Sequence, residues 1–152
     1  MSTLKQLESS RLVRPHKSSL GEIETQFAVV ARNLSDASVP QLSDDGRFLM
    51  AYNAAFALST IALLASGFQA HGDDHHKVTF STLPATMGNH MTFLADYLDR
   101  CRRKRNNIQY DQVNVATKSE AEELYKKVLT FRADVLEWLE GNHPQLAPGV
   151  AA

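Results

Sequence analysis

Residues 48–70 contain no charged side chain, within a chain of 152 residues. Alanine dominates this stretch, and Asn53, Ser59 and Thr60 interrupt it. A helix that is apolar on every side and rich in small residues is typical of the centre of a helical bundle, because neighbouring helices can approach it closely. The stretch is also long enough to span a bilayer. Its polar interruptions, and the lack of flanking tryptophan or lysine anchors, favour a buried core helix instead.

Size and composition are those of an ordinary globular protein, with 43% hydrophobic and 22% charged residues. A chain of this length can bury roughly two-thirds of its unfolded surface, which suffices for one domain. We expect an N-terminal extension over residues 1–17, a helical bundle over residues 18–142 and a flexible tail over residues 143–152. The tail is assigned because its residues are small and polar.

Two helix starts are predicted in the first third of the chain. An amphipathic pattern begins at Leu20, with Ser19 as a candidate N-cap, and a break over residues 36–41 ends it. Ser43 is a candidate N-cap for the uncharged helix, and the acidic residues that follow it favour the helix dipole.

Two further amphipathic helices are predicted in the second half. One begins near Asn89, and its apolar stripe includes Arg105. The last begins at Thr117, where Glu120 completes a capping box, and Gly141 and Pro144 are expected to end it.

The segment between the second and third long helices is predicted to be a polar connector followed by one short helical turn or irregular crossover, over residues 71–88. No alternation of branched residues indicates a strand. The fold class predicted is therefore all-α. It is an up-and-down four-helix bundle with a short extra helix between the second and third long helices.

Charge and cysteine content restrict the function classes. The net charge of -1 provides no overall attraction to nucleic acid or to an anionic membrane, so any such binding requires a local patch. Cys101 is the only cysteine, which excludes an internal disulfide and a cysteine-based zinc site. Residues 1–17 lack the apolar core of a secretory signal. We expect a cytoplasmic protein that does not bind membranes.

One dense basic run provides such a patch. Residues 100–105 carry five cations in six positions. On a helix, Arg102, Asn106 and Tyr110 lie on one ridge, whereas Arg105 turns toward the apolar stripe. A guanidinium on a core-facing stripe needs a partner or a ligand. The candidate nucleic-acid-binding residues are Arg102, Arg103 and Arg105.

The run from Arg105 to Tyr110, RNNIQY, resembles the signature of HEPN domains, in which Arg-Asn is followed after three residues by histidine. The resemblance extends to the helical architecture over residues 20–138. Many HEPN domains are metal-independent ribonucleases that act as dimers, with the arginine and histidine of both chains facing one cleft. The resemblance implies that Arg105 holds the scissile phosphate while the histidine moves a proton.

This chain departs from the HEPN signature at the histidine, because Tyr110 occupies that position. The candidate catalytic residues that carry over are Arg105, Asn106 and Tyr110. A phenol with an ordinary pKa of about 10 is a poor general base at neutral pH. The sequence therefore favours binding over chemistry, and any enzyme activity would be that of a metal-independent endoribonuclease.

Histidines cluster in the connector, where His71, His75 and His76 accompany two aspartates. Their spacing matches no standard metal site, and we expect a polar loop without a metal. One of them, or His90, is a candidate for the missing proton-transfer group. Phosphate-loop and dinucleotide glycine patterns are absent, so no cofactor is expected.

Three functions are compatible with the sequence. The first is binding of RNA or nucleotide phosphates at a two-fold cleft of a homodimer, with or without cleavage, as in toxin–antitoxin and defence systems. The second is a non-catalytic module that dimerises or docks a partner such as a nucleotidyltransferase. The third is a small-molecule site lined by Tyr52, Asn53 and Arg105.

Overall fold

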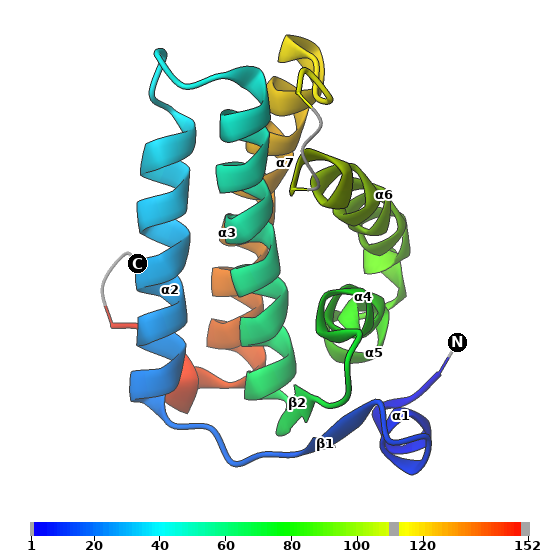
Figure 1. Ribbon diagram of the computed structural model, residues 1–152. Helices are drawn as coiled ribbons and strands as arrows, with labels where there is room; N and C mark the ends of the chain where they lie inside the picture. The colour runs from blue at the N-terminus through cyan, green and yellow to red at the C-terminus, as the bar shows by residue number, and fades with distance from the viewer. Residues whose placement is uncertain (1, 110–112, 150–152) are drawn as a thin grey trace.

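The computed structural model describes residues 2–109 and 113–149. Four long helices dominate it (Figure 1), so the all-α class is confirmed. In chain order these helices are α2 (Leu20–Ala37), α3 (Asp44–Ala65), α6 (Thr92–Gln109) and α7 (Lys118–Asn142).

Local capping explains where three of the long helices begin. Ser19, Ser43 and Thr117 are the N-caps of α2, α3 and α7, and each side-chain oxygen accepts a hydrogen bond from a backbone N–H of the first turn. Thr117 also forms the predicted capping box with Glu120. The third helix differs by one turn from its predicted start, because Asn89–Met91 forms a 3₁₀ helix that leads into α6.

The core is built around α3, which lies between α2 and α7 (Figure 1) and contacts both. Ala51, Ala54 and Ala55 of α3 are fully buried, so the small side chains bring the neighbouring helices close to its backbone. By length and composition α3 would pass as a membrane span, but most of it is buried inside the protein. This burial agrees with the interpretation of the uncharged stretch as a core helix.

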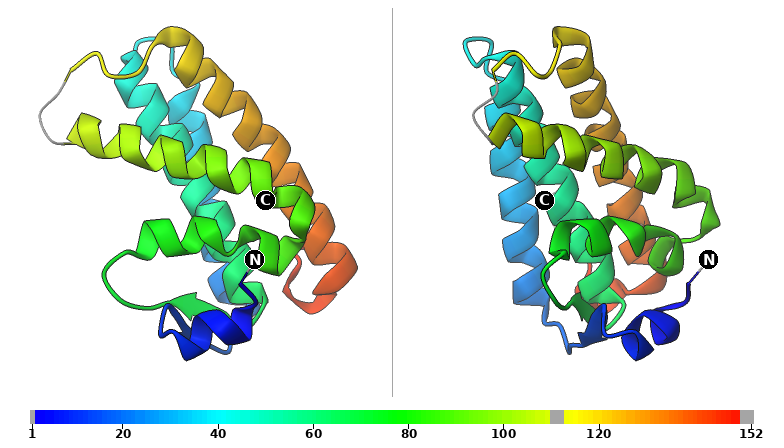
Figure 2. Two further views of the ribbon diagram at one scale, coloured as in Figure 1. Left: turned by 90° about the vertical axis from the view of Figure 1, so that its right-hand side faces the viewer. Right: turned by 45° about the vertical axis from the view of Figure 1, so that its right-hand side comes forward.

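Helix α6 does not lie alongside the other three. In the left view of Figure 2 it crosses α3 and α7 obliquely and lies above two short helices. These are α4 (His75–Ser81) and α5 (Leu83–Met87), where the sequence predicted a polar connector and a single short helix. Contacts join α6 to α4, to α5 and to α3. The two short helices therefore pack against the same helix, α6.

The prediction that the chain has no strand is wrong. The strands β1 (Val13–Pro15) and β2 (Phe68–Ala70) pair in antiparallel register, with Val13 opposite Ala70. The helix α1 (Leu4–Ser9) precedes β1, and its Leu7 packs with Val13, Leu63 and Val78 in a small second core. Much of the expected N-terminal extension is therefore packed against the end of α3 and against α4.

The described part of the expected flexible tail is also structured. Pro144–Leu146 forms the 3₁₀ helix η2, which follows α7, and Leu146 is buried in the main core. Helix α7 ends at Asn142, between the two residues expected to stop it. The C-terminal segment up to residue 149 thus contributes one apolar side chain to the core.

Candidate functional site

The second half of α6 presents Arg105 toward the aromatic side chains of α3. The Arg105 guanidinium carbon lies 5.5 Å from the centre of the Tyr52 ring, which is the geometry of a cation–π contact. Its Nη1 donates a hydrogen bond to Asn106 Oδ1 at 3.2 Å. Its Nε is buried and has no hydrogen-bond partner among the described residues. The described residues therefore leave the guanidinium incompletely hydrogen-bonded, since they provide a partner only for Nη1.

Arg102 lies one turn earlier and is half-buried. Its Nε donates to Asp99 Oδ1 at 2.9 Å, and Nη2 of Arg103 donates to the other oxygen of Asp99 at 3.0 Å. Partial burial raises the pKa of Asp99, but the two arginine hydrogen bonds outweigh it and hold the pKa below the ordinary value. Asp99 is thus ionised at neutral pH, and it orients both guanidinium groups.

The basic run does not form a single surface. The Arg103 side chain is 67% exposed and projects into solvent. Lys104 lies on another side of α6, where its ammonium pairs with Glu120 at 2.9 Å. Arg102 and Arg105 therefore share the side of α6 that faces α3 and α4, and Lys104 joins α6 to α7 instead.

A histidine of α4 joins this side of the molecule. The Nδ1 atom of His76 and the hydroxyl oxygen of Tyr52 share a hydrogen bond of 2.7 Å. The imidazole also stacks on Phe56, with ring centres 3.8 Å apart and planes within 6° of each other. Phe80 lies edge-on to both Tyr52 and Phe56. The orientation of His76 is therefore fixed by one hydrogen bond and one aromatic stack.

The surroundings keep His76 neutral. Burial and, to a smaller extent, the nearby charges of Arg105, His75 and Arg102 together lower its pKa from 6.5 to about 4. Burial raises the pKa of Tyr52, so its phenol stays protonated at neutral pH. His76 Nε2 has no hydrogen-bond partner among the described residues. A neutral imidazole with one such nitrogen can bond to a ligand or exchange a proton with it.

These side chains define the Arg105 face, which consists of Arg102, Arg105, Tyr52 and His76. Two of the three predicted nucleic-acid-binding residues belong to it, and Arg103 lies at its solvent edge. Asn106 touches Arg105. The remaining predicted catalytic residue, Tyr110, lies outside the described residues.

Of the three connector histidines, one lies at the Arg105 face. His71 and His75 are exposed, whereas His76 packs into the Arg105 face. In residues 2–109 and 113–149, no three histidine, cysteine or acidic side chains are grouped so that they could hold a metal. The signal for His76 was its spacing of four residues from Phe80, which places both on one side of α4.

The expected small-molecule site of Tyr52, Asn53 and Arg105 is formed only in part. Tyr52 and Arg105 are in contact. The Asn53 amide instead donates to Asn33 Oδ1 on α2 at 3.3 Å. Asn53 therefore links α3 to α2 and does not join the Arg105 face.

Comparison of the chain with protein-family models, with curated proteins and with solved structures finds no match.

Proposed function

We propose that this protein binds RNA or nucleotide phosphates through the Arg105 face. The observation that carries the proposal is the state of Arg105, whose guanidinium is held on the Tyr52 ring with a buried Nε that has no partner among the described residues. A cation retained in such a position needs an anion to complete its hydrogen bonds. Guanidinium groups bind phosphate oxygens in a bidentate manner, which suits them to this ligand.

Arg102 and His76 extend the same surface. Asp99 occupies only the Nε of Arg102, so the terminal nitrogens of Arg102 have no partner among the described residues. Neutral His76 adds a group that can donate to, or accept from, a phosphate or a ribose hydroxyl. Two guanidinium groups could thus bind a phosphate, and the imidazole could hydrogen-bond to the neighbouring sugar.

The resemblance of RNNIQY to the HEPN signature supports the same ligand. Residues 105–109 of this run lie in α6, which crosses α3 and α7 obliquely instead of completing an up-and-down four-helix bundle with them. The proposal includes a homodimer, in which the Arg105 faces of two copies flank one strand of RNA. A role in a toxin–antitoxin or defence system would be consistent with such an activity.

The second level of the proposal is that the protein also cleaves the RNA that it binds. In place of the histidine that the signature lacks here, His76 would accept the proton of a 2′-hydroxyl as its oxygen attacks phosphorus. The bond from phosphorus to the 5′-oxygen would break, and water would protonate the leaving oxygen. Arg105 would stabilise the charge that develops on the phosphate.

The test is fluorescence anisotropy with labelled single-stranded RNA, in excess chelator and over a range of salt concentrations. We expect salt-sensitive binding that Arg105→Ala weakens, with the slope of log affinity against log salt reduced by about one. Arg32→Ala, which removes an exposed cation of α2, is the matched control and should bind like the wild type.

The same samples report cleavage on a denaturing gel. Products that disappear in both Arg105→Ala and His76→Gln would support the second level. Salt-sensitive binding without products would leave a binding protein. No binding at all would overturn the proposal and favour the alternative, a non-catalytic module that dimerises or docks a partner such as a nucleotidyltransferase.

A further inference from the structure

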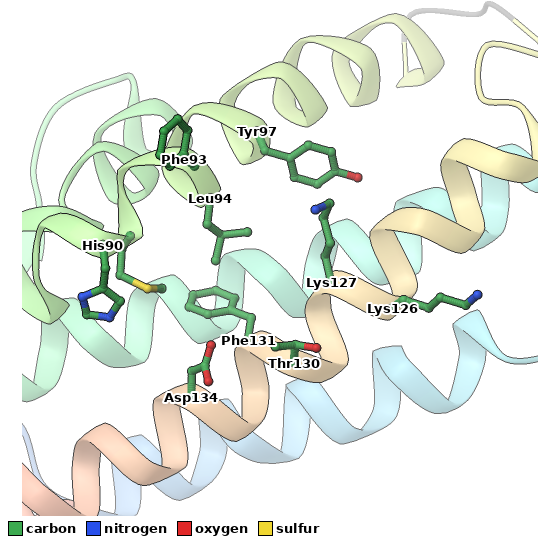
Figure 3. Close-up of a pocket in the computed structure, with 10 residues that line it drawn as sticks. His90, Phe93, Leu94, Tyr97, Lys126, Lys127, Thr130, Phe131 and Asp134 are labelled. Carbon is green, nitrogen blue, oxygen red and sulfur yellow. The ribbon is translucent and has the colours of Figure 1, made fainter.

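A groove of about 500 Å³ lies between the first half of α6 and the middle of α7 (Figure 3). Its volume is in the range of about 300–1,000 Å³ that is usual for small-molecule sites. None of its lining residues belongs to the Arg105 face. Its lining includes Phe93, Leu94, Tyr97, Lys127, Phe131 and Asp134.

The middle of the groove is apolar and aromatic. Leu94 of α6 and Phe131 of α7 point toward each other across it (Figure 3). Phe93 lies at its rim, and 87% of this residue is exposed. A large aromatic side chain so exposed beside an apolar groove is a typical contact for a flat apolar ligand.

The charges of the groove are separated along α7. The ammonium of Lys127 lies 5.1 Å from the centre of the Tyr97 ring, and Figure 3 shows it reaching toward that ring. Asp134 lies seven residues after Lys127 in α7, which is about 10 Å along the helix axis. Neither Lys127 nor Asp134 forms an ion pair with another described residue.

This arrangement is complementary to one class of small molecule. We propose that the groove binds an aromatic carboxylate that carries a hydroxyl group at its opposite end. Its ring system lies on Leu94 and Phe131 and covers Phe93. Its carboxylate pairs with Lys127, and its hydroxyl donates to the Asp134 carboxylate. The neighbouring Lys126 makes the carboxylate end of the groove more positive.

Charge complementarity decides in favour of this occupant over a second copy of the chain. A protein interface of standard size buries about 800 Å² on each partner, with charged side chains depleted at its centre. Here Lys127 and Asp134, which form no ion pair with another described residue, flank a short apolar centre, and an aromatic ligand with polar groups at both ends complements this pattern. A self-association of the chain through Phe93 is an outcome that the test can detect.

The test compares 6-hydroxy-2-naphthoate with 2-naphthoate and with the neutral 2-naphthamide, by isothermal titration and by NMR shift mapping. We expect 2-naphthoate to bind at least about tenfold more tightly than 2-naphthamide, as one charge-assisted hydrogen bond provides. Lys127→Met should make the affinities for 2-naphthoate and 2-naphthamide about equal. The hydroxyl should increase affinity further, and Asp134→Ala should remove that increase.

Two controls keep the result specific to the groove. Lys118→Met removes an exposed cation from the first turn of α7 and should leave all three affinities unchanged. Circular dichroism and thermal unfolding establish that each variant is folded. Equal affinity for naphthoate and naphthamide, or NMR shifts located away from Phe93 and Lys127, would overturn the proposal. So would a doubling of mass by light scattering that Phe93→Ser abolishes, together with no naphthoate binding.

Discussion

The hydroxyl oxygen of Tyr52 on α3 lies 2.7 Å from Nδ1 of His76 on α4. Tyr52 is fully buried, whereas the imidazole is half exposed and stacks on Phe56. A side chain of the central helix therefore sets which way the imidazole faces at the surface. The same tyrosine ring supports the guanidinium of Arg105, so both polar groups are positioned from one residue.

Removing the Tyr52 hydroxyl should therefore destabilise the fold. In Tyr52→Phe the aromatic packing remains, but His76 Nδ1 loses its partner, at a cost of about 1 kcal/mol in the free energy of unfolding. Urea denaturation measures this cost. The control is Tyr125→Phe, because the described residues provide no hydrogen bond to the Tyr125 hydroxyl. Equal stability of both variants would show that the Tyr52–His76 bond contributes nothing net.

The low pKa of His76 should make stability depend on pH. Burial lowers this pKa from 6.5 to about 4, so the unfolded chain takes up the proton first as the pH falls. The contribution of neutral His76 to the free energy of unfolding is complete above about pH 6.5 and is lost as the pH falls toward 4. Its size should be on the order of 1 kcal/mol, since the half-exposed ring is partly screened by water.

Urea denaturation at a series of pH values, beside an NMR titration of the imidazole, measures this dependence. His76→Gln should lose less stability between pH 6.5 and 4 than the wild type. His71→Gln, which changes an exposed histidine that does not contribute to the pKa shift of His76, should behave like the wild type. An imidazole that titrates near its ordinary value would contradict the burial that the structure assigns to His76.

Asp45 should stabilise the connection between α6 and α7. Its carboxylate oxygens accept hydrogen bonds from the backbone N–H groups of Val115 at 3.3 Å and of Ala116 at 2.7 Å. Asp45→Asn should therefore cost about 1–2 kcal/mol in the free energy of unfolding. Asp44→Asn removes a charge from the same first turn without these bonds, so it isolates the effect of the helix dipole. Equal losses would assign the whole effect to the dipole.

The alanines of α3 should not tolerate larger side chains. Ala55 is fully buried, so Ala55→Leu should overpack the core and cost about 1–3 kcal/mol or more. Ala133→Leu places the same side chain on an exposed position of α7 and should change stability by no more than about 0.5 kcal/mol. Thermal unfolding of both variants measures the difference. Tolerance at Ala55 would mean that the helices around α3 can separate.

The helix starts could be predicted because their signals are local. Ser19, Ser43 and Thr117 each cap the helix that immediately follows them, so neighbours in sequence carry the whole signal. The strands β1 and β2 could not be predicted in this way. Each has three residues, which is too short for a period-two pattern, and their pairing joins Val13 to Ala70 across the whole of α2 and α3.

The candidate site could be predicted only on the helix that carries it. The basic run and the polar face of α6 were visible in the sequence, as was the unusual placement of Arg105 on an apolar stripe. The contact of Arg105 with Tyr52 depends on the oblique crossing of α6 over α3, which no local pattern encodes. His76 is one of the candidate proton-transfer groups in the sequence, but the polar residues around it indicate a loop, whereas in the structure Val78 and Phe80 of the same segment are buried in α4.

The apolar surface of α3 has a consequence for synthesis of the chain. α7 covers one side of α3 and consists of residues 118–142, so it emerges from the ribosome after α2, α3 and α6. Until then residues 48–65 of α3, which carry no charge, have no cover on that side, and such an exposed apolar surface binds chaperones and promotes aggregation. Premature termination before α7 would therefore yield an insoluble fragment rather than a smaller folded protein.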